Sequence, residues 1–161
     1  MVKHVTNEIL KKISLFRGLN EDELEEIAKF CSVRAYEVGE LCQSEGQMAD
    51  QVHFIHKGKL GVEFHIPNIA YGCKDIVLDT LGSGDIFGWS ALLKGTPWST
   101  LRAIEPTEAI YINATDLLNL CNSNNRIGYM VMKNLATIIT SRLRRNRMAT
   151  LNAIVAIKGG W

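Results

Sequence analysis

Residues 85–103 have the sequence DIFGWSALLKGTPWSTLRA, which is unlike the sequence on either side of it. We expect a strand ending at Phe87, a break at Gly88, and one helical turn built by SALL at 90–93. The start of such a turn exposes unpaired backbone N–H groups, whose dipoles favour a bound anion. Glycine permits unusual backbone dihedrals, and the small Ser90 and Ala91 let a phosphate approach the backbone closely. The segment is therefore a candidate anion site.

The sequence around this segment, from Ser32 to about Ile112, has a period of two that predicts strands. Apolar side chains at 60, 62, 64 and 66 alternate with polar residues or glycine, which is typical of a strand with one buried face. Turn sequences such as VGE at 38–40 and LGSGD at 81–85 separate these runs. About seven or eight short strands at this spacing indicate a β-sandwich or barrel.

Helical spacing of apolar residues occurs on both sides of the strand region. Residues 6–31 are predicted to form two short helices, the second capped by Asn20 and Glu23 in a capping box. The acidic residues at 21–26 lie where the helix dipole favours negative charge, so we favour a structural role for them. After Asn113 we expect a short helix at about 116–121 and a long one at about 126–147, with the tail at 148–161 left unassigned.

Length and composition limit the classes of protein that fit this chain. Its 161 residues suit a single domain, and 47% hydrophobic with 22% charged residues is ordinary for a globular protein. A net charge of +1 gives no global argument for nucleic acid or an anionic membrane as partner. The four cysteines lack CxxC spacing, so we expect small buried hydrophobes rather than a metal site or disulfides. No signal-like or membrane-spanning run is present, which predicts a cytoplasmic location.

Several short motifs follow one another in an order that matches a known family. The segments are LFRGL at 15–19, YEVGE at 36–40, EG at 45–46, FIHKG at 54–58, DIFG at 85–88, SALL at 90–93 and LRA at 101–103. Together they resemble the cyclic nucleotide-binding domain family, the sensor fold of catabolite activator proteins and of cyclic-nucleotide-gated channels and kinases. The last three segments resemble its phosphate-binding cassette. The resemblance covers roughly residues 13–147.

The resemblance implies one mainly β domain with flanking helices over residues 1–161. Its centre would be a double-stranded β-helix, or jelly roll, at 32–113, preceded by N-terminal helices at 1–31. Helices at 114–147 would follow, the last serving as a lid and often as a dimer seam. This order agrees with the helix, strand, helix order that periodicity predicts independently.

The cassette departs from the family at two charged positions. Family members that hold cyclic AMP or cyclic GMP have a Glu after the cassette Gly, where this chain has Trp89. The Arg that pairs with the phosphate falls at Pro97 or Trp98, depending on where a gap is placed. Arg102 matches a different family position and is no ready substitute. A charge-assisted hydrogen bond contributes about 1.5–3 kcal/mol, so its loss weakens phosphate binding roughly tenfold to more than a hundredfold.

The altered cassette defines the candidate site and its ligand. The candidate ligand-binding residues are Gly88, Trp89, Ser90, Ala91, Leu92, Trp98, Ser99 and Thr100. The two hydroxyls at 99 and 100 are able to donate from the opposing strand, while the two indoles either stack on a ligand or fill the vacated pocket. We expect no required cofactor, and as ligand a weakly held cyclic nucleotide or another small anion.

These inferences predict a small-molecule sensor, of the kind found in prokaryotic regulators, that signals through its last helix. Its apolar stripe at Ile127, Val131, Leu135, Ile138 and Leu143 is long for one jelly roll, so we expect a second chain to cover it in a homodimer. For the arginines at 142, 144, 145 and 147, we favour stabilisation of the helix C-terminal end through the helix dipole over binding of an acidic partner. Ligand capture would move the helix after Asn125.

Three other functions compete with the sensor. Residues 148–161 are too few for a helix-turn-helix, so we expect no direct DNA binding, and no membrane partner. A cupin-like metalloenzyme would use His53, His56 and His65, but the first two are three apart and should face opposite sides of a strand, so we expect no enzyme. A ligand-free sensor fold that acts as a dimerisation or protein-interaction module stays open.

Overall fold

The computed structural model describes residues 4–68 and 72–158, and it contains helices at both ends of a strand region. The helices are α1 (Asn7–Leu10), η1 (Ser14–Phe16), α2 (Glu21–Ala28), η2 (Trp89–Leu93), α3 (Ala114–Ser123) and α4 (Asn125–Lys158). The strands are β1 (Cys31–Tyr36), β2 (Leu41–Gln43), β3 (Gln51–Lys57), β4 (Lys59–Asn68), β5 (Gly72–Gly82), β6 (Ile86–Phe87), β7 (Thr100–Ala103) and β8 (Thr107–Asn113).

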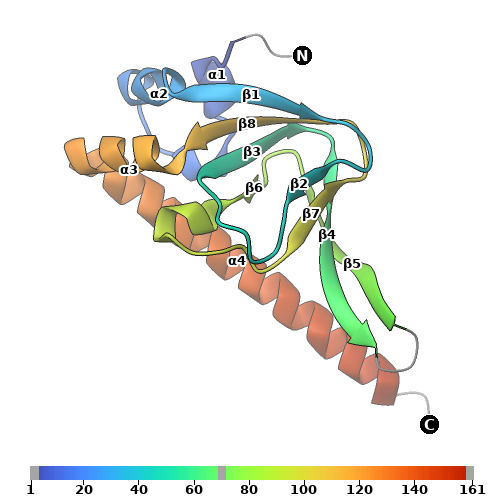
Figure 1. Ribbon diagram of the computed structural model, residues 1–161. Helices are drawn as coiled ribbons and strands as arrows, with labels where there is room; N and C mark the ends of the chain where they lie inside the picture. Colours follow the sequence, from blue (N-terminus) through green and yellow to red (C-terminus); the bar gives the residue numbers. More distant parts are fainter. Residues whose placement is uncertain (1–3, 69–71, 159–161) are drawn as a thin grey trace.

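The strands form two antiparallel sheets of four strands each. One has the order β1-β8-β3-β6 and the other β2-β7-β4-β5, and they face each other as the two walls of the roll (Figure 1). The prediction of a mainly β jelly roll with flanking helices is confirmed.

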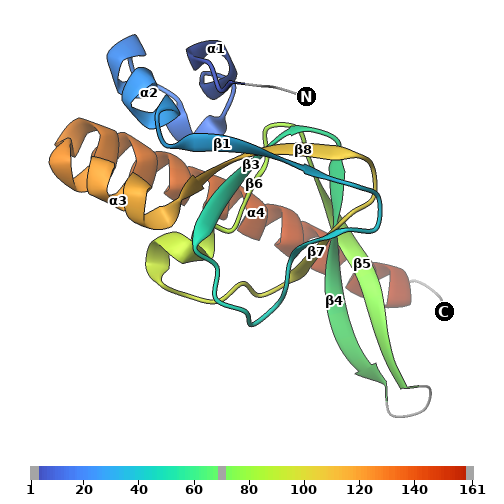
Figure 2. The ribbon, with the colours of Figure 1, turned by 45° about the horizontal axis from the view of Figure 1, so that its top comes forward.

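Alternation along the strands divides the apolar residues between two cores. On β3, Val52 and Phe54 pack with the N-terminal helices, α3 and α4, whereas Ile55 packs with residues of the opposite sheet. Successive strand side chains point to opposite faces, so the β1-β8-β3-β6 sheet separates a helix-side core from a core inside the roll. Figure 2 shows α1, α2 and α3 together at one end of this sheet, and the β4–β5 hairpin of the second sheet projecting on the opposite side of the molecule.

The N-terminal helices are fixed by the capping box that the sequence predicts. The Asn20 side chain accepts from the Glu23 amide at 2.9 Å, and the Glu23 carboxylate accepts from the Asn20 amide at 2.8 Å. Glu23 is only 6% exposed and pairs with Arg126 at the start of α4. The Arg126 guanidinium holds the pKa of this carboxyl below its usual range. One member of the acidic cluster therefore ties α2 to α4.

Helix α4 differs from the sequence prediction in its length and in what covers it. It continues through 148–158, the segment left unassigned, because neither glycine nor proline interrupts residues 129–158. Ile127, Val131 and Leu135 are buried within this chain, so the expectation that a second chain covers this part of the stripe is wrong. Leu143, in contrast, is 68% exposed.

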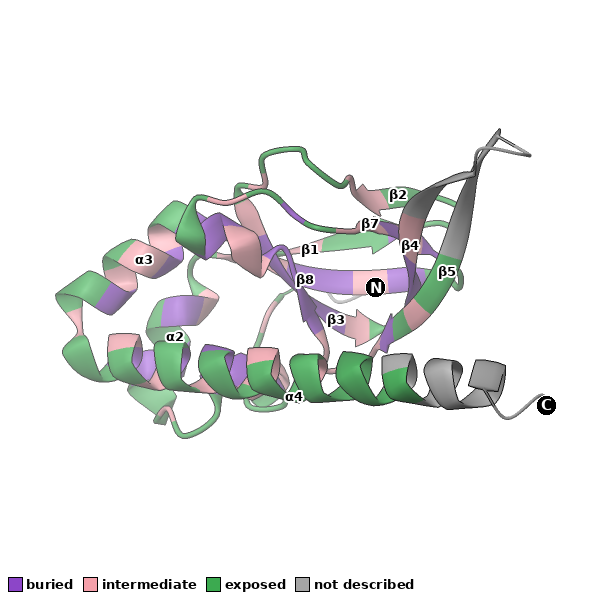
Figure 3. Ribbon diagram, turned by 90° about the horizontal axis from the view of Figure 1, so that it is seen from below, coloured by how far each residue is buried: buried purple, intermediate pink, exposed green. Residues whose placement is uncertain are grey.

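The outward side of α4 is open along most of its length, as the view from below in Figure 3 shows. In the part of the chain that the structure describes, none of the helices is both long and apolar enough to cross a membrane.

Candidate ligand-binding site

Gly88 joins β6 to η2 at a point where only glycine fits. Its φ is +72°, and a Cβ there would lie 2.3 Å from the Gln51 carbonyl oxygen on the neighbouring strand β3. The residue thus needs both a left-handed backbone and the absence of a side chain. The helical turn expected after it is present as the 3₁₀ helix η2.

The backbone of η2 provides a smaller anion cradle than the sequence suggests. The Ala91 amide already donates to the Gly88 carbonyl at 3.0 Å, and the side chains of Ala91 and Leu92 are buried in the helix-side core. Within residues 4–68 and 72–158, the Trp89 and Ser90 amides have no hydrogen-bond acceptor. Two amides therefore remain for an anion.

The second half of the cassette is arranged around β7. Trp98 is 86% exposed, whereas Trp89 is partly buried and packs against the helix-side core. The Ser99 carbonyl accepts from the Gln43 side chain at 3.0 Å, and the Thr100 hydroxyl accepts from the Glu45 amide at 3.2 Å. Thr100 thus holds the β2 end against β7, and the ligand roles expected for these residues stay predictions.

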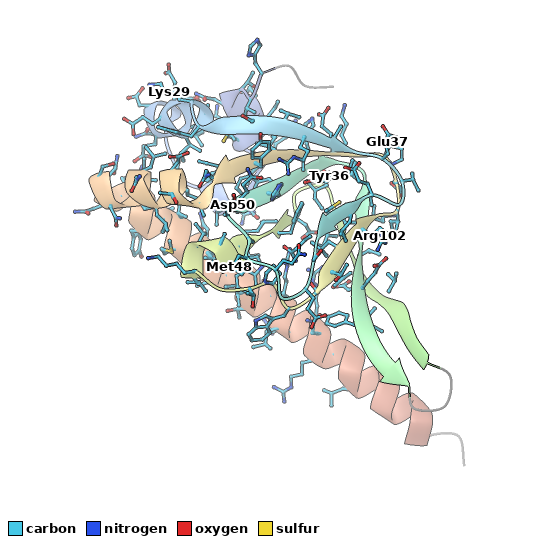
Figure 4. All side chains as sticks on the ribbon, in the orientation of Figure 1. Lys29, Tyr36, Glu37, Met48, Asp50 and Arg102 are labelled. Carbon is cyan, nitrogen blue, oxygen red and sulfur yellow. The ribbon has the colours of Figure 1, made fainter. Side chains whose placement is uncertain are left out.

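Arg102 does not replace the missing cassette arginine. Its Nε donates to both carboxylate oxygens of Glu63, at 3.0 and 3.3 Å, and another nitrogen donates to the Gly39 carbonyl at 3.0 Å. These bonds join β7, which carries Arg102 (Figure 4), to β4 and to the turn before β2.

A contact that sequence reasoning missed links α4 to the cassette. Arg142 donates to the backbone carbonyl of Ile86 on β6, two residues before Gly88. Burial lowers the pKa of Arg142, which Asp85 partly offsets. The spacing in the sequence indicates this contact, because Arg142 lies four residues after Ile138 and therefore on the inward-facing side of the helix.

Beside Gly88 is a half-open pocket of about 160 Å³ that is lined by β1, the segment 42–51, β3, β6 and Pro97. Its lining residues are Arg34, Cys42, Gln43, Ser44, Gln47, Met48, Ala49, Asp50, Gln51, His53, Phe87, Gly88 and Pro97. Of the eight candidate residues, Gly88 alone lines this pocket. Burial raises the pKa of the Cys42 thiol to about 12, so it is no nucleophile there.

His53 is the most deeply buried polar side chain of this pocket. It is 7% exposed, stacks on Phe87 with ring centroids 4.5 Å apart, and neither ring nitrogen has a hydrogen-bond partner among the described residues. Burial lowers its pKa to about 4, so the ring is neutral near pH 7. Among the side chains that the structure describes, no group of three His, Cys, Asp or Glu is placed to hold a metal; that of His65 lies outside them.

The two-sheet roll, the short helix inserted after a left-handed glycine and the long final helix define a cyclic nucleotide-binding type of sensor domain. A family model for the cyclic nucleotide-binding domain matches residues 33–124. The chain belongs to the cyclic nucleotide-binding domain family.

Two proteins of known name are similar in sequence to most of this chain. The cyclic AMP receptor protein of Thermus thermophilus is 28% identical over 137 residues, which are 84% of this chain and 59% of that protein. Glutaminase 1 of Bradyrhizobium diazoefficiens is 29% identical over 140 residues, 87% of this chain but 21% of the glutaminase. The chain thus spans about three fifths of one relative and about a fifth of the other.

Solved structures share the fold. A cyclic nucleotide-binding domain from Methylobacillus flagellatus has a TM-score of 0.77 at 24% identity, covering 91% of this chain and 80% of that one. The catabolite activator protein of Thermus thermophilus has a TM-score of 0.67 at 26% identity, covering 88% and 63%.

Proposed function

We propose that this chain is a non-enzymatic sensor module that binds a small anion at its cassette and signals through α4. The observation that carries the proposal is the hydrogen bond from Arg142 on α4 to the Ile86 carbonyl, beside the cassette turn. A ligand that shifts Gly88 and η2 also shifts this strand end and the helix resting on it. Two relatives bear the names of a receptor and an activator, in line with a regulatory role.

The ligand of this proposal is a cyclic nucleotide bound weakly, or another small anion. The free amides of Trp89 and Ser90 support anion binding. No cassette side chain replaces the missing acid and base, because Trp89 packs on the core and Arg102 is paired with Glu63. No cofactor is required for this role.

The proposed working form is a homodimer in the cytoplasm that contacts neither DNA nor a membrane itself. The support is a set of exposed apolar residues on the outward side of α4, namely Tyr129, Met132, Leu143 and Leu151. Their spacings of 3, 11 and 8 residues return to one side of a helix with 3.6 residues per turn. We call these four residues the outer stripe.

The second candidate is a ligand-free module that acts through protein contacts. It is favoured by two hydrogen bonds within the fold: the Ala91 amide donates to the Gly88 carbonyl, and the Thr100 hydroxyl accepts from the Glu45 amide. Both hydrogen bonds reduce the number of cassette groups that are able to bind a ligand.

Thermal melts separate the two candidates. Cyclic AMP, cyclic GMP, cyclic dinucleotides, phosphate and sulfate are each titrated to millimolar concentration. A true ligand raises the melting temperature with dose, because it binds only the folded state. If none of these compounds shifts the melt, the sensor proposal fails for them and the ligand-free module is favoured.

Hydrogen exchange tests the signalling step. For a compound that passes the melt, we expect altered exchange over residues 126–147, and a smaller response in Arg142→Gln. The exposed neighbour Arg145 provides the control, because Arg145→Gln leaves the contact with Ile86 intact. Unchanged exchange on ligand addition to the unmodified protein would contradict signalling through α4.

A further inference from the structure

The pocket beside Gly88 carries three side chains that the cassette does not use, and the first of them is His53. His53 is more than nine-tenths buried, and beyond a weak interaction with the Gln51 backbone its ring nitrogens are unpaired among the described residues. A neutral imidazole offers one donor and one acceptor, and an unmade buried hydrogen bond costs about 1–3 kcal/mol. A resident molecule that bonds to this ring would recover that energy.

Arg34 supplies the positive charge of the pocket. Its guanidinium carbon lies 4.9 Å from the centre of the Tyr111 ring, a cation–π contact that holds the group near the pocket. Among the described residues it forms no ion pair with a carboxylate. Part of its N–H edge faces the hydroxyls of Tyr36 and Tyr111. The rest of the edge is able to pair with a carboxylate by a charge-assisted hydrogen bond.

Asp50 supplies a negative charge on the same lining. It lies at the end of the segment between β2 and β3 that also carries Met48 (Figure 4). Like Arg34, it forms no ion pair within the described part of the chain. With His53 neutral, one positive and one negative charge face the pocket. Such a lining disfavours a phosphate dianion, which Asp50 repels, and fits a guest with separated charges and no net charge.

We propose that this pocket binds a free amino acid as a zwitterion. Its carboxylate pairs with Arg34, its ammonium group with Asp50, and a polar side chain reaches His53 or the amides of Gln47 and Gln51. The pocket volume of about 160 Å³ is below the roughly 300–1,000 Å³ of most cofactor and drug sites, which suits a guest of this size.

The amino-acid site adjoins the cassette site but depends on different charged side chains. Trp89, Ser90, Ala91, Leu92, Trp98, Ser99 and Thr100 do not line it. Gly88 is common to both, and so is Pro97, one of the two positions where the family's phosphate-binding Arg aligns. An occupied pocket would support the turn from the β3 side. Failure of either proposal leaves the other standing, because they depend on different side chains and different probes.

The test is a melt and calorimetry screen of the full chain against the standard L-amino acids. We expect at least one of them to bind saturably, with acetate, methylamine and phosphate giving no comparable shift. Arg34→Gln and Asp50→Asn should each weaken that binding about 10- to 100-fold, the loss of one charge-assisted hydrogen bond. Arg144→Gln, an exposed charge on α4, is the control and should bind as the unmodified chain does.

Two results would overturn the proposal. One is a screen in which no amino acid binds. The other is binding that acetate or phosphate reproduces, or that both Arg34→Gln and Asp50→Asn leave unchanged. Both residues are exposed, so these variants are expected to fold, and their melts without amino acid verify this.

Discussion

Gly88 and Gly84 have the same backbone requirement but different surroundings. Both have positive φ, +72° and +87°, yet a Cβ on Gly84 would meet nothing within 4 Å, whereas one on Gly88 would meet the Gln51 carbonyl at 2.3 Å. We expect Gly84→Ala to cost about 1–2 kcal/mol of unfolding free energy, the strain of a left-handed alanine. Gly88→Ala should cost clearly more, because β3 and η2 must also separate. Urea unfolding of both variants measures the difference, and equal losses would contradict the close approach.

Pro97 and Trp98 both stand where the family's phosphate-binding Arg could be aligned. The structure distinguishes them, because Pro97 is buried and lines the pocket while Trp98 is 86% exposed. If the cassette takes a cyclic nucleotide, Pro97→Arg should raise its affinity for cyclic AMP about 10- to 100-fold. Trp98→Arg should leave that affinity nearly unchanged. Isothermal calorimetry tests this, and a gain confined to Trp98→Arg would contradict the assignment.

A single residue's role can be predicted from the sequence when neighbouring residues determine it, and not when distant strands do. Gly88 is recognisable because its turn is encoded by its immediate neighbours. Arg34 and His53 are not, since they come together only through strand pairing. β8 lies between β1 and β3, and Tyr111 pairs with Ser32 on one side and His53 on the other. From the sequence alone, His53 stands out only as a candidate ligand of a cupin-like metal site, which its spacing from His56 argues against, and Arg34 does not stand out at all.

At the scale of elements, the pair between Glu23 and Arg126 joins α2 to α4. Arg126 also donates to the Gly18 carbonyl at 2.9 Å. Arg126→Ala leaves a buried carboxylate without its partner, which we expect to cost about 1–3 kcal/mol, less than a fully buried pair because Arg126 is half exposed. Lys59→Ala removes an exposed ion pair with Glu105 and should change stability by less than about 0.5 kcal/mol.

The pair between Glu23 and Arg126 also determines how the free energy of unfolding changes with pH. The folded-state pKa of Glu23 is below its usual value of 4.5, chiefly because of the bond to Arg126. Its contribution to stability is therefore present above about pH 4.5 and is lost as the pH falls through the lowered folded value. The stability difference between the unmodified chain and Arg126→Ala should shrink in that range. Denaturant unfolding at several pH values checks this, and a difference independent of pH would contradict it.

The extent of α4 shows what a periodicity argument misses. The stripe from Ile127 to Leu135 was correctly placed on a helix, because each position packs against the N-terminal helices and α3. Residues 148–158 also carry apolar residues at helical spacing, at 148, 151 and 155, which the prediction of a helix ending at about 147 overlooks. The lack of a stop signal before Gly159 was a further clue.

For the whole molecule, the outer stripe is the surface on which dimer formation depends. A helix of 34 residues is about 50 Å long, and only its first part is covered by the chain's own core. Leu143→Asp places a charge in the middle of the outer stripe, which two facing helices would have to desolvate. We therefore expect the unmodified chain to sediment as a dimer and Leu143→Asp to sediment as a monomer.

Leu78 provides the matched control for this prediction. It is 61% exposed, close to the 68% of Leu143, but lies on β5 rather than α4. Leu78→Asp adds the same charge with the same loss of apolar surface, so it should remain a dimer if α4 forms the seam. Sedimentation velocity measures all three proteins at one concentration. An unmodified chain that sediments at the monomer mass of 18.0 kDa would contradict the homodimer, and dissociation by Leu78→Asp alone would move the interface to the hairpin.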